Sequence, residues 1–378
     1  MIPVLWLGGP PGVGKTAVAW EIYARLERAG SAPAYVDVDQ LGMCHPPEAS
    51  DPERHMLKAR NVSALRRNFS AAGARCLVVS GVADASRGPE VGALGGPPIT
   101  VGRLRSDPAE LRARLARRQG SFAQPDAAVV EADLLDHSTF AHWSLDTTEL
   151  SVSEVANRVL AEAGDWAATG MDRRDRPPPD NGARDRATGE VLWLCGTTGV
   201  GKSTVGFRVY LDVLRSGIPA AYVDVDQLGF CSTAPSDHLL RAQNLAALWA
   251  NFHDAGVRVA VVVGPVASRP DAHLYERALP KATFTWCSLH VRGEELTRRI
   301  LSRGEGGSWP QPGDPLRDQP RDELLKIADR AILAAQMLAG RPVGLRINLD
   351  GLSIDEAAET IRKVAAWPAA KMTENGPN

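Results

Sequence analysis

Two stretches of this 378-residue chain carry glycines, a lysine and a hydroxyl residue in the spacing G-x-x-x-x-G-K-[ST]. The glycines allow the backbone to fold closely around an anion, so that its N–H groups point at phosphate oxygens. The lysine can then reach the β- and γ-phosphates, and the hydroxyl can bind Mg²⁺. The residues assigned to phosphate binding are Gly9, Gly12, Val13, Gly14, Lys15 and Thr16 in the first stretch, and Gly196, Gly199, Val200, Gly201, Lys202 and Ser203 in the second.

A pair of aspartates follows an apolar segment in each half of the chain. Asp37 and Asp39 close the segment 34–38, and Asp224 and Asp226 follow the segment 220–223 in the same way. Side chains alternate along a strand, so we expect both acids of a pair on one face. One carboxylate can help to hold Mg²⁺ while the other accepts a hydroxyl proton during phosphoryl transfer. The alternative is that these acids only cap the helix that follows.

The elements that must position these residues are strands alternating with helices. Each phosphate-binding stretch lies between an apolar run and a helical pattern, which is the setting that the motif requires. The predicted strands are 2–7, 34–38, 76–80, 99–104 and 140–145 in the first half and 191–194, 220–223, 258–263, 284–290 and 343–347 in the second. The predicted helices include 17–28, 52–72, 153–163, 204–215 and 322–338. This alternation predicts an α/β fold with doubly wound parallel sheets of about five strands.

An internal repeat predicts the domain organisation. The ten residues from Tyr35 to Cys44 recur from Tyr222 to Cys231 with one difference. We interpret the repeat as a tandem duplication, which would allow the copies to pack about a pseudo-twofold axis. The predicted units are a first copy, 1–165, a proline-, arginine- and aspartate-rich linker, 166–189, a second copy, 190–367, and a flexible tail, 368–378.

Composition excludes several classes of partner. A formal net charge of −2 provides no basic footprint for nucleic acid or an anionic membrane. The longest apolar runs fall far short of the roughly 20 residues that a membrane-spanning helix needs. The five cysteines are odd in number and include no Cys-x-x-Cys spacing, so neither a zinc site nor a disulfide framework is indicated. We expect a cytoplasmic protein with reduced cysteines that binds neither nucleic acid nor a membrane.

The phosphate-binding stretch together with the Asp-x-Asp pair resembles the P-loop small-molecule kinases, the group of shikimate, gluconate and adenylylsulfate kinases. The segments 77–81 and 261–265 lack the acid pair that an AAA-type motor would carry there. The resemblance implies that Asp37 and Asp224 serve Mg²⁺, whereas Asp39 and Asp226 face the phosphate acceptor. It also implies catalytic lid arginines, at positions matched here by Arg114, Arg118, Arg299 and Arg303.

Cations in the acceptor region of such kinases would suit an anionic acceptor. The residues placed there by the resemblance are Lys58 and Arg241, on the helix after Asp-x-Asp, and Arg87 and Arg269, after the third strand. The resemblance therefore implies an enzyme that moves the γ-phosphoryl group of ATP, with Mg²⁺, to a small-molecule hydroxyl or phosphate at two sites per chain. The alternative is a nucleotide-binding switch that hydrolyses ATP slowly and acts through a protein partner.

Overall fold

The computed structural model describes residues 1–96, 98–117, 124–169, 187–306 and 311–369. Most of the predicted linker (170–186) and of the predicted tail (370–378) lies outside the described residues. At the described ends of the linker, Trp166 is buried and Gly189 already belongs to a strand. No helix in the described ranges combines the length and the apolar character needed to cross a membrane.

The first copy is built on a five-stranded parallel sheet with the strand order β2-β4-β1-β5-β6. Its strands are β1 (Val4–Gly8), β2 (Pro33–Asp37), β4 (Cys76–Ser80), β5 (Ile99–Arg105) and β6 (Trp143–Asp146). Its helices are α1 (Lys15–Arg28), α2 (Val38–Leu41), α3 (His55–Ala71), α4 (Pro108–Arg117), α5 (Pro125–Asp136) and α6 (Val152–Ala163), followed by η1 (Trp166–Thr169). Strands β1, β2 and β4 are buried along their whole length because helices cover both faces of the sheet.

The second copy repeats this strand order in a six-stranded sheet, β11-β10-β7-β9-β8-β3. Its own strands are β7 (Gly189–Cys195), β8 (Ala220–Asp224), β9 (Val259–Val263), β10 (Ala282–His290) and β11 (Leu345–Asn348). Its helices are α7 (Lys202–Arg215), η3 (Val225–Leu228), α8 (His238–Asp254), α9 (Arg269–Ala278), α10 (Gly293–Gly304), α11 (Arg321–Gly340) and α12 (Ile354–Ala365). The prediction of two doubly wound α/β sheets is confirmed.

The sixth strand of the second sheet comes from the first copy. Strand β3 (Cys44–His45) pairs antiparallel with β8, so that Cys44 lies opposite Ala221. The reciprocal contact is a bridge between Ala34 and Cys231. Backbone hydrogen bonds follow the same exchange, because Tyr35 N–H donates to the Phe230 carbonyl and Tyr222 N–H donates to the Met43 carbonyl. Each copy thus covers an edge strand of the other, which removes an exposed sheet edge.

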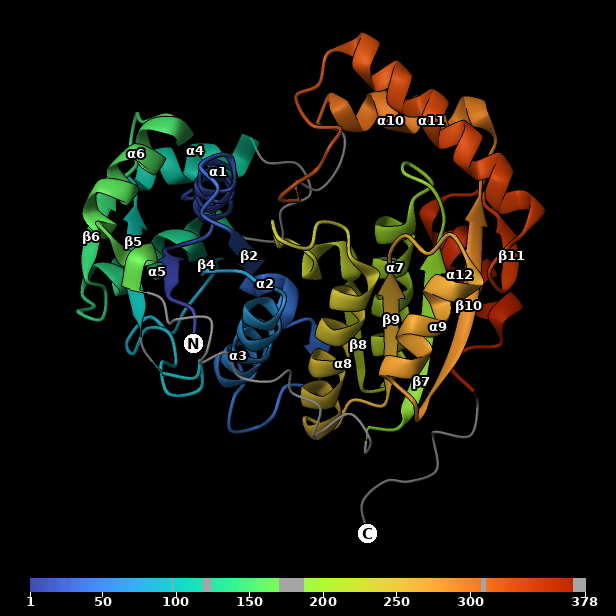
Figure 1. Ribbon diagram of the computed structural model, residues 1–378, viewed down its shortest axis with the longest axis horizontal. Coiled ribbons are helices and arrows are strands. Elements are labelled where there is room, and N and C mark those ends of the chain that lie inside the picture. Colours follow the sequence, from blue (N-terminus) through green and yellow to red (C-terminus); the bar gives the residue numbers. More distant parts are fainter. Residues whose placement is uncertain (97, 118–123, 170–186, 307–310, 370–378) are drawn as a thin grey trace.

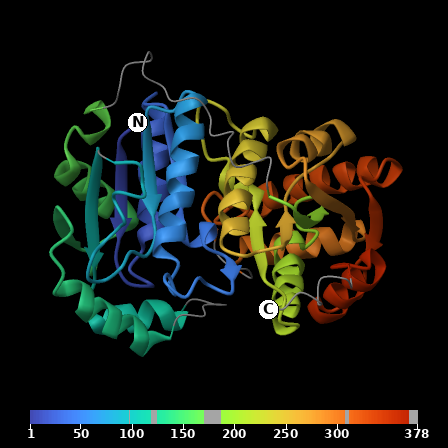
Figure 2. The ribbon, with the colours of Figure 1, turned by 90° about the horizontal axis from the view of Figure 1, so that it is seen from below.

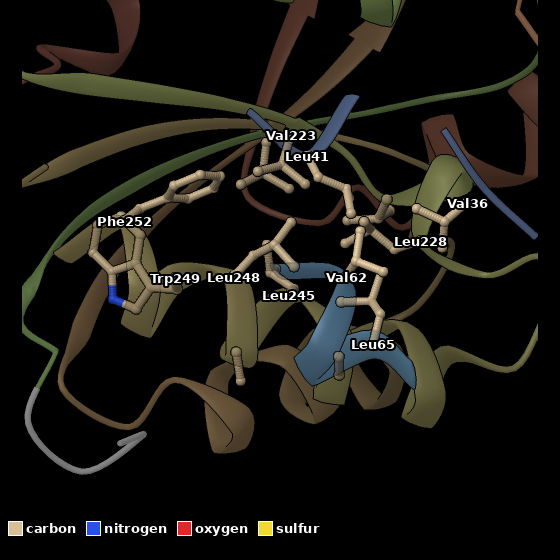
Figure 3. Close-up of a cluster of buried hydrophobic side chains, with 14 of the residues drawn as sticks. Val36, Leu41, Val62, Leu65, Val223, Leu228, Leu245, Leu248, Trp249 and Phe252 are labelled. Atoms are coloured by element: carbon tan, nitrogen blue, oxygen red, sulfur yellow. The ribbon is translucent and has the colours of Figure 1, made fainter. Parts of the chain in front are cut away.

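Helices α3 and α8 lie side by side between the two sheets (Figures 1 and 2). The hydrophobic cluster at this contact contains residues of both copies, among them Val62 and Leu65 from α3 and Leu245 and Leu248 from α8 (Figure 3). Helix α3 therefore buries residues both toward its own sheet and toward α8. Its buried side chains consequently cover a wide part of its circumference rather than one stripe. The two copies share this part of their core.

Candidate active site

The phosphate-binding loops lie at the carboxyl ends of β1 and β7, where the strand order reverses. This is the position at which open α/β sheets bind ligands. Gly12 and Gly199 have φ of +83° and +82°, and a Cβ atom at either would lie 2.8 Å from a side-chain carbon, of Leu115 and Ile300 respectively. Glycine is required here both by the left-handed backbone and by the close packing. Each loop leads directly into the N-terminus of α1 or α7, whose free N–H groups favour an anion.

The two lysines lie folded back over their loops. Lys15 Nζ donates to the carbonyl of Pro10 at 2.9 Å. Lys202 Nζ donates to the carbonyls of Gly196 and Thr197 at 2.9 and 3.0 Å, and burial lowers its pKa. A phosphate entering the loop would give either ammonium an anionic partner in place of neutral carbonyl oxygens.

A hydroxyl–carboxylate pair adjoins each lysine. Thr16 Oγ1 donates to Asp37 Oδ2 at 2.9 Å, and Ser203 Oγ donates to Asp224 Oδ2 at 2.9 Å. The other oxygen of each carboxylate accepts the backbone N–H two residues on, so these acids also cap the following helix. Burial and the neighbouring second acid raise the pKa of Asp37 and of Asp224 to about 6. A cation here would offset that cost by favouring the charged form.

The second acid of each pair is not on the strand. Strand β2 ends at Asp37 and strand β8 ends at Asp224, so Asp39 and Asp226 lie in the short helices that follow. The expectation that strand alternation places both acids on one face is therefore wrong. The cap formed by the first acid turns the chain into a helix, and this turn presents the second acid.

The cations predicted on α3 and α8 meet these second acids. Lys58 Nζ lies 3.9 Å from Asp39 Oδ1, and Arg241 Nη2 lies 3.2 Å from Asp226 Oδ1. Arg241 is nearly buried, with 11% of its side chain exposed, whereas 44% of the Asp226 side chain is exposed. A glycine leaves room for each cation. A Cβ atom at Gly229 would lie 2.6 Å from Arg241 Nε, and one at Gly42 would lie 2.6 Å from Lys58 Cε. The acid in each pair thus remains accessible while its partner anchors it.

The predicted lid arginines divide into two kinds. Arg114 Nη1 and Arg299 Nη1 donate to the loop carbonyls of Val13 and Val200, at 3.3 and 2.7 Å. These two arginines buttress the phosphate-binding loops. Arg303 instead lines the cavity described below and pairs with the buried Asp314 at 2.7 Å. Its counterpart in the first copy, Arg118, lies outside the described residues.

Two predicted acceptor cations are not brought to a site by the described contacts. Arg269 begins α9 and pairs with Glu276 at 3.5 Å, with 52% of its side chain exposed. Arg87 is an exposed residue in a turn, where its backbone N–H donates to Asp84. Both positions follow the third strand of their copy as predicted, but no contact among the described residues joins either arginine to a phosphate-binding loop or to its acid pair.

A cavity of about 770 Å³ opens beside the second phosphate-binding loop. Its charged lining residues are Lys202, Asp226, Arg241, Arg303, Asp314 and Arg330. Four of these are cations and two are acids, so the cavity favours an anion. His238 also lines it and is hydrogen-bonded through Nδ1 to Tyr275 Oη at 2.9 Å.

Several residues at the two sites were not predicted, because they belong to no sequence motif. Gln311 Nε2 lies 3.4 Å from Asp224 Oδ2, and Tyr23, from the first copy, lines the cavity of the second. At the first site, Glu131 of α5 is acted on electrostatically by Lys15 and Asp39, and burial raises its pKa. The only sequence signal was that Tyr23 has a repeated counterpart, Tyr210.

The residues present fit a magnesium ion. The hydroxyls of Thr16 and Ser203 and the carboxylates of Asp37 and Asp224 offer the oxygen donors that Mg²⁺ prefers. No cluster of three or more His, Cys, Asp or Glu side chains suited to a metal occurs in the described part of the chain. Mg²⁺ commonly uses one or two carboxylates together with substrate phosphates and water, so this donor set suits an ion that arrives with a nucleotide.

Solved structures of P-loop small-molecule kinases resemble about half of the chain, as predicted. A gluconokinase from Sinorhizobium meliloti is 15% identical with a TM-score of 0.29, and the match covers 48% of this chain and 95% of the other. The Mycobacterium tuberculosis APS kinase in complex with AMPPNP and APS is 20% identical with a TM-score of 0.32, covering 47% and 98%. A sugar kinase from Janibacter is 16% identical with a TM-score of 0.34, covering 46% and 100%. By sequence, no family model and no curated protein matches the chain.

Proposed function

We propose that this protein is an ATP-dependent phosphotransferase that acts on a small-molecule acceptor, with one nucleotide site in each copy. The observation that carries the proposal is the joint position of four groups at each site. A lysine folded over the loop, a hydroxyl–carboxylate pair and a more exposed second acid all lie at the carboxyl ends of the strands of their sheet. These are the groups that phosphoryl transfer needs for positioning, for charge neutralisation and for accepting a proton.

The residues divide the reaction between them. Lys202 and the loop N–H groups would hold the β- and γ-phosphates of ATP, and Ser203 with Asp224 would hold Mg²⁺, which would supply further neutralisation of charge. The acceptor hydroxyl donates its proton to Asp226 while its oxygen bonds to the γ-phosphorus. The bond between that phosphorus and the β–γ bridging oxygen breaks, and ADP leaves. Lys15, Thr16, Asp37 and Asp39 take the same roles in the first copy.

The cavity of the second copy supports an anionic acceptor. Arg241 holds Asp226, while Arg303 and Arg330 line the space in front of it. A volume of about 770 Å³ has room for both a nucleotide and a metabolite-sized acceptor. The matched strand order and the reciprocal contacts of the two copies further support a tandem duplication with pseudo-twofold packing.

The decisive test is transfer of labelled γ-phosphate from ATP to a panel of small anionic and neutral hydroxyl compounds. We expect Asp39→Asn and Asp226→Asn each to lower transfer at their own site by about 100-fold or more, because the proton acceptor is lost. ATP affinity should stay within about twofold, since phosphate contacts contribute most of the binding. Asp254→Asn changes an exposed carboxylate at the end of α8 and should leave both quantities unchanged.

Two outcomes would contradict the proposal. One is ATP turnover that no small molecule increases but a protein fraction does, which is the behaviour of a nucleotide-dependent switch. The other is loss of ATP binding in Asp226→Asn with normal turnover of the ATP that still binds, which would reverse the roles of the two acids.

A further inference from the structure

The segment 311–316 of the second copy lies between the second site and the first copy. Gln311, Pro312, Gly313 and Asp314 line the same cavity as Lys202 and Asp226. Gln311 Nε2 lies 3.4 Å from Asp224 Oδ2, the carboxylate oxygen that also accepts from Ser203. The position of this segment therefore determines what surrounds the metal-binding acid.

Contacts within the second copy hold the C-terminal side of the segment most firmly. Asp314, whose side chain is 3% exposed, pairs with Arg303 at 2.7 Å and accepts the backbone N–H of Leu316 at 3.1 Å. Leu316 is buried in a small cluster with Ile300 and Leu324. At the other end, the contact that the described residues give the Gln311 side chain is a long hydrogen bond to Asp224, of 3.4 Å.

The middle of the segment rests on an aromatic residue of the first copy. Gly313 has φ of +69°, and a Cβ atom there would lie 2.8 Å from Trp20 Cη2 and 2.9 Å from Phe230 Cε1. The backbone of Gly313 thus lies directly against both rings, which is possible because it has no side chain. The rings also contact each other, with centroids 4.8 Å apart and planes inclined at 69°.

Trp20 belongs to helix α1, which starts at Lys15 at the phosphate-binding loop of the first copy. Its ring also packs on Tyr23 and Tyr35, with centroids 5.0 and 5.4 Å away, so the indole is fixed from its own side. A rigid surface of the first copy therefore supports a segment of the second.

We propose that Trp20 is a positioning residue for the second site, supplied by the first copy. It seats the 311–316 segment so that Gln311 stays beside Asp224 and Asp314 stays beside Arg303. The second site is then complete only when the first copy is folded against it. The structural part of this inference is independent of the proposed function, whereas its effect on catalysis rests on it.

Phe207 provides a matched control. It occupies the position in α7 that Trp20 occupies in α1, and its ring packs against Tyr210 and Tyr222 at 5.8 and 5.5 Å. Phe207→Ala removes a ring from an equivalent place without touching the support of Gly313. Trp20→Phe keeps an aromatic surface at the original place.

The first measurement is amide hydrogen exchange of the full-length protein, read from peptides covering 311–316. We expect Trp20→Ala to speed exchange in this segment by about threefold to tenfold, since one aromatic contact is removed. Trp20→Phe and Phe207→Ala should remain close to the wild type there. Unchanged exchange in Trp20→Ala, or equal acceleration in Phe207→Ala, would overturn the proposal. If circular dichroism shows that Trp20→Ala has not folded, Trp20→Leu, which removes the ring but keeps an apolar side chain, takes its place, and unchanged exchange in that variant would overturn the proposal.

The second measurement uses the Lys15→Ala background, in which phosphotransfer comes from the second site. Trp20→Ala should lower kcat/KM there by about threefold to tenfold, with rescue by Trp20→Phe. If Lys15→Ala and Lys15→Ala/Trp20→Ala have equal kcat/KM, the catalytic role of Trp20 is overturned even if hydrogen exchange changes. If the protein with native Lys15 and Trp20 phosphorylates no acceptor, the proposed function fails, and hydrogen exchange alone decides the role of Trp20.

Discussion

Asn244→Ala should destabilise the protein far more than the loss of one amide group suggests. Asn244 is completely buried on α8, where its Nδ2 donates to the carbonyl of Leu228 at 2.7 Å. Its Oδ1 accepts from Asn68 Nδ2 of the first copy at 2.9 Å. The reciprocal pair is present, because Asn61 Nδ2 donates to Leu41 and its Oδ1 accepts from Asn251.

The magnitude follows from the groups left behind. Removing Asn244 deprives two buried groups of this partner, the Leu228 carbonyl and the Asn68 amide. Each such loss costs about 1–3 kcal/mol, so we expect a decrease of roughly 2–6 kcal/mol in the free energy of unfolding. Asn251→Ala, which removes a single bond from a half-buried residue, should cost roughly 1–2 kcal/mol.

The assay is equilibrium unfolding of the full-length protein in urea, followed by circular dichroism. The double variant Asn68→Ala/Asn244→Ala should be destabilised by less than the sum of the single variants, because the orphaned amide of Asn68 is then also gone. A cost of Asn244→Ala no larger than that of Asn251→Ala would refute the reasoning. Strict additivity in the double variant would refute the link across the interface.

Three further predictions concern the phosphate-binding loops. Lys15→Ala and Lys202→Ala should each abolish one phosphorylation event and weaken nucleotide binding at that site by about 30- to 100-fold, read as product mass and ATP stoichiometry. Gly199→Ala should destabilise the protein by about 1–3 kcal/mol through its clash with Ile300, and Gly217→Ala, at φ of +75° with no atom within 4 Å, separates that clash from backbone strain. The pKa of Asp37, raised from 3.8 to about 6, means that its contribution to stability is lost as pH rises from about 4 to about 6. The melting temperature of Asp37→Asn relative to the wild type should therefore be higher at pH 7 than at pH 4. Stabilisation by Mg²⁺ and ATP should increase as the pH rises through 6 in the wild type but not in Asp37→Asn.

Each of these has an outcome that would contradict it. Wild-type stoichiometry in either lysine variant would make that copy a scaffold. Equal destabilisation by the two glycine variants would show that the backbone conformation, and not the contact with Ile300, requires glycine. A melting temperature of Asp37→Asn that tracks the wild type at every pH would mean that this carboxylate is not held in a costly environment.

The strands and the phosphate-binding loops could be predicted from the sequence because their signals are local. Cys76–Ser80 was predicted to the residue, since a short apolar run can only be a buried strand in such an alternation. Helices α5 and α9 were not predicted, because Pro125–Asp136 has no consistent apolar stripe and Arg269–Ala278 is mostly polar. Their positions depend on what they pack against.

The sequence by itself determined which residues the proposed chemistry uses. The spacing of glycine, lysine and hydroxyl residues occurs twice and predicts two phosphate-binding loops, and the repeat at Tyr35 and Tyr222 predicts two copies. Both signals arise within a few tens of residues, where backbone geometry leaves few alternatives.

Only the tertiary structure decided how the two copies complete each other. The exchange of strand β3, the buried asparagine contacts and the support of Gly313 by Trp20 each join residues of different copies. These residues lie between 175 positions apart in the chain, for His45 and Ala220, and 293 positions apart, for Trp20 and Gly313. Each of these residues reads as ordinary core or surface in its own segment. Side-chain packing between surfaces, which no local pattern encodes, brings them together and makes the second site depend on the first copy.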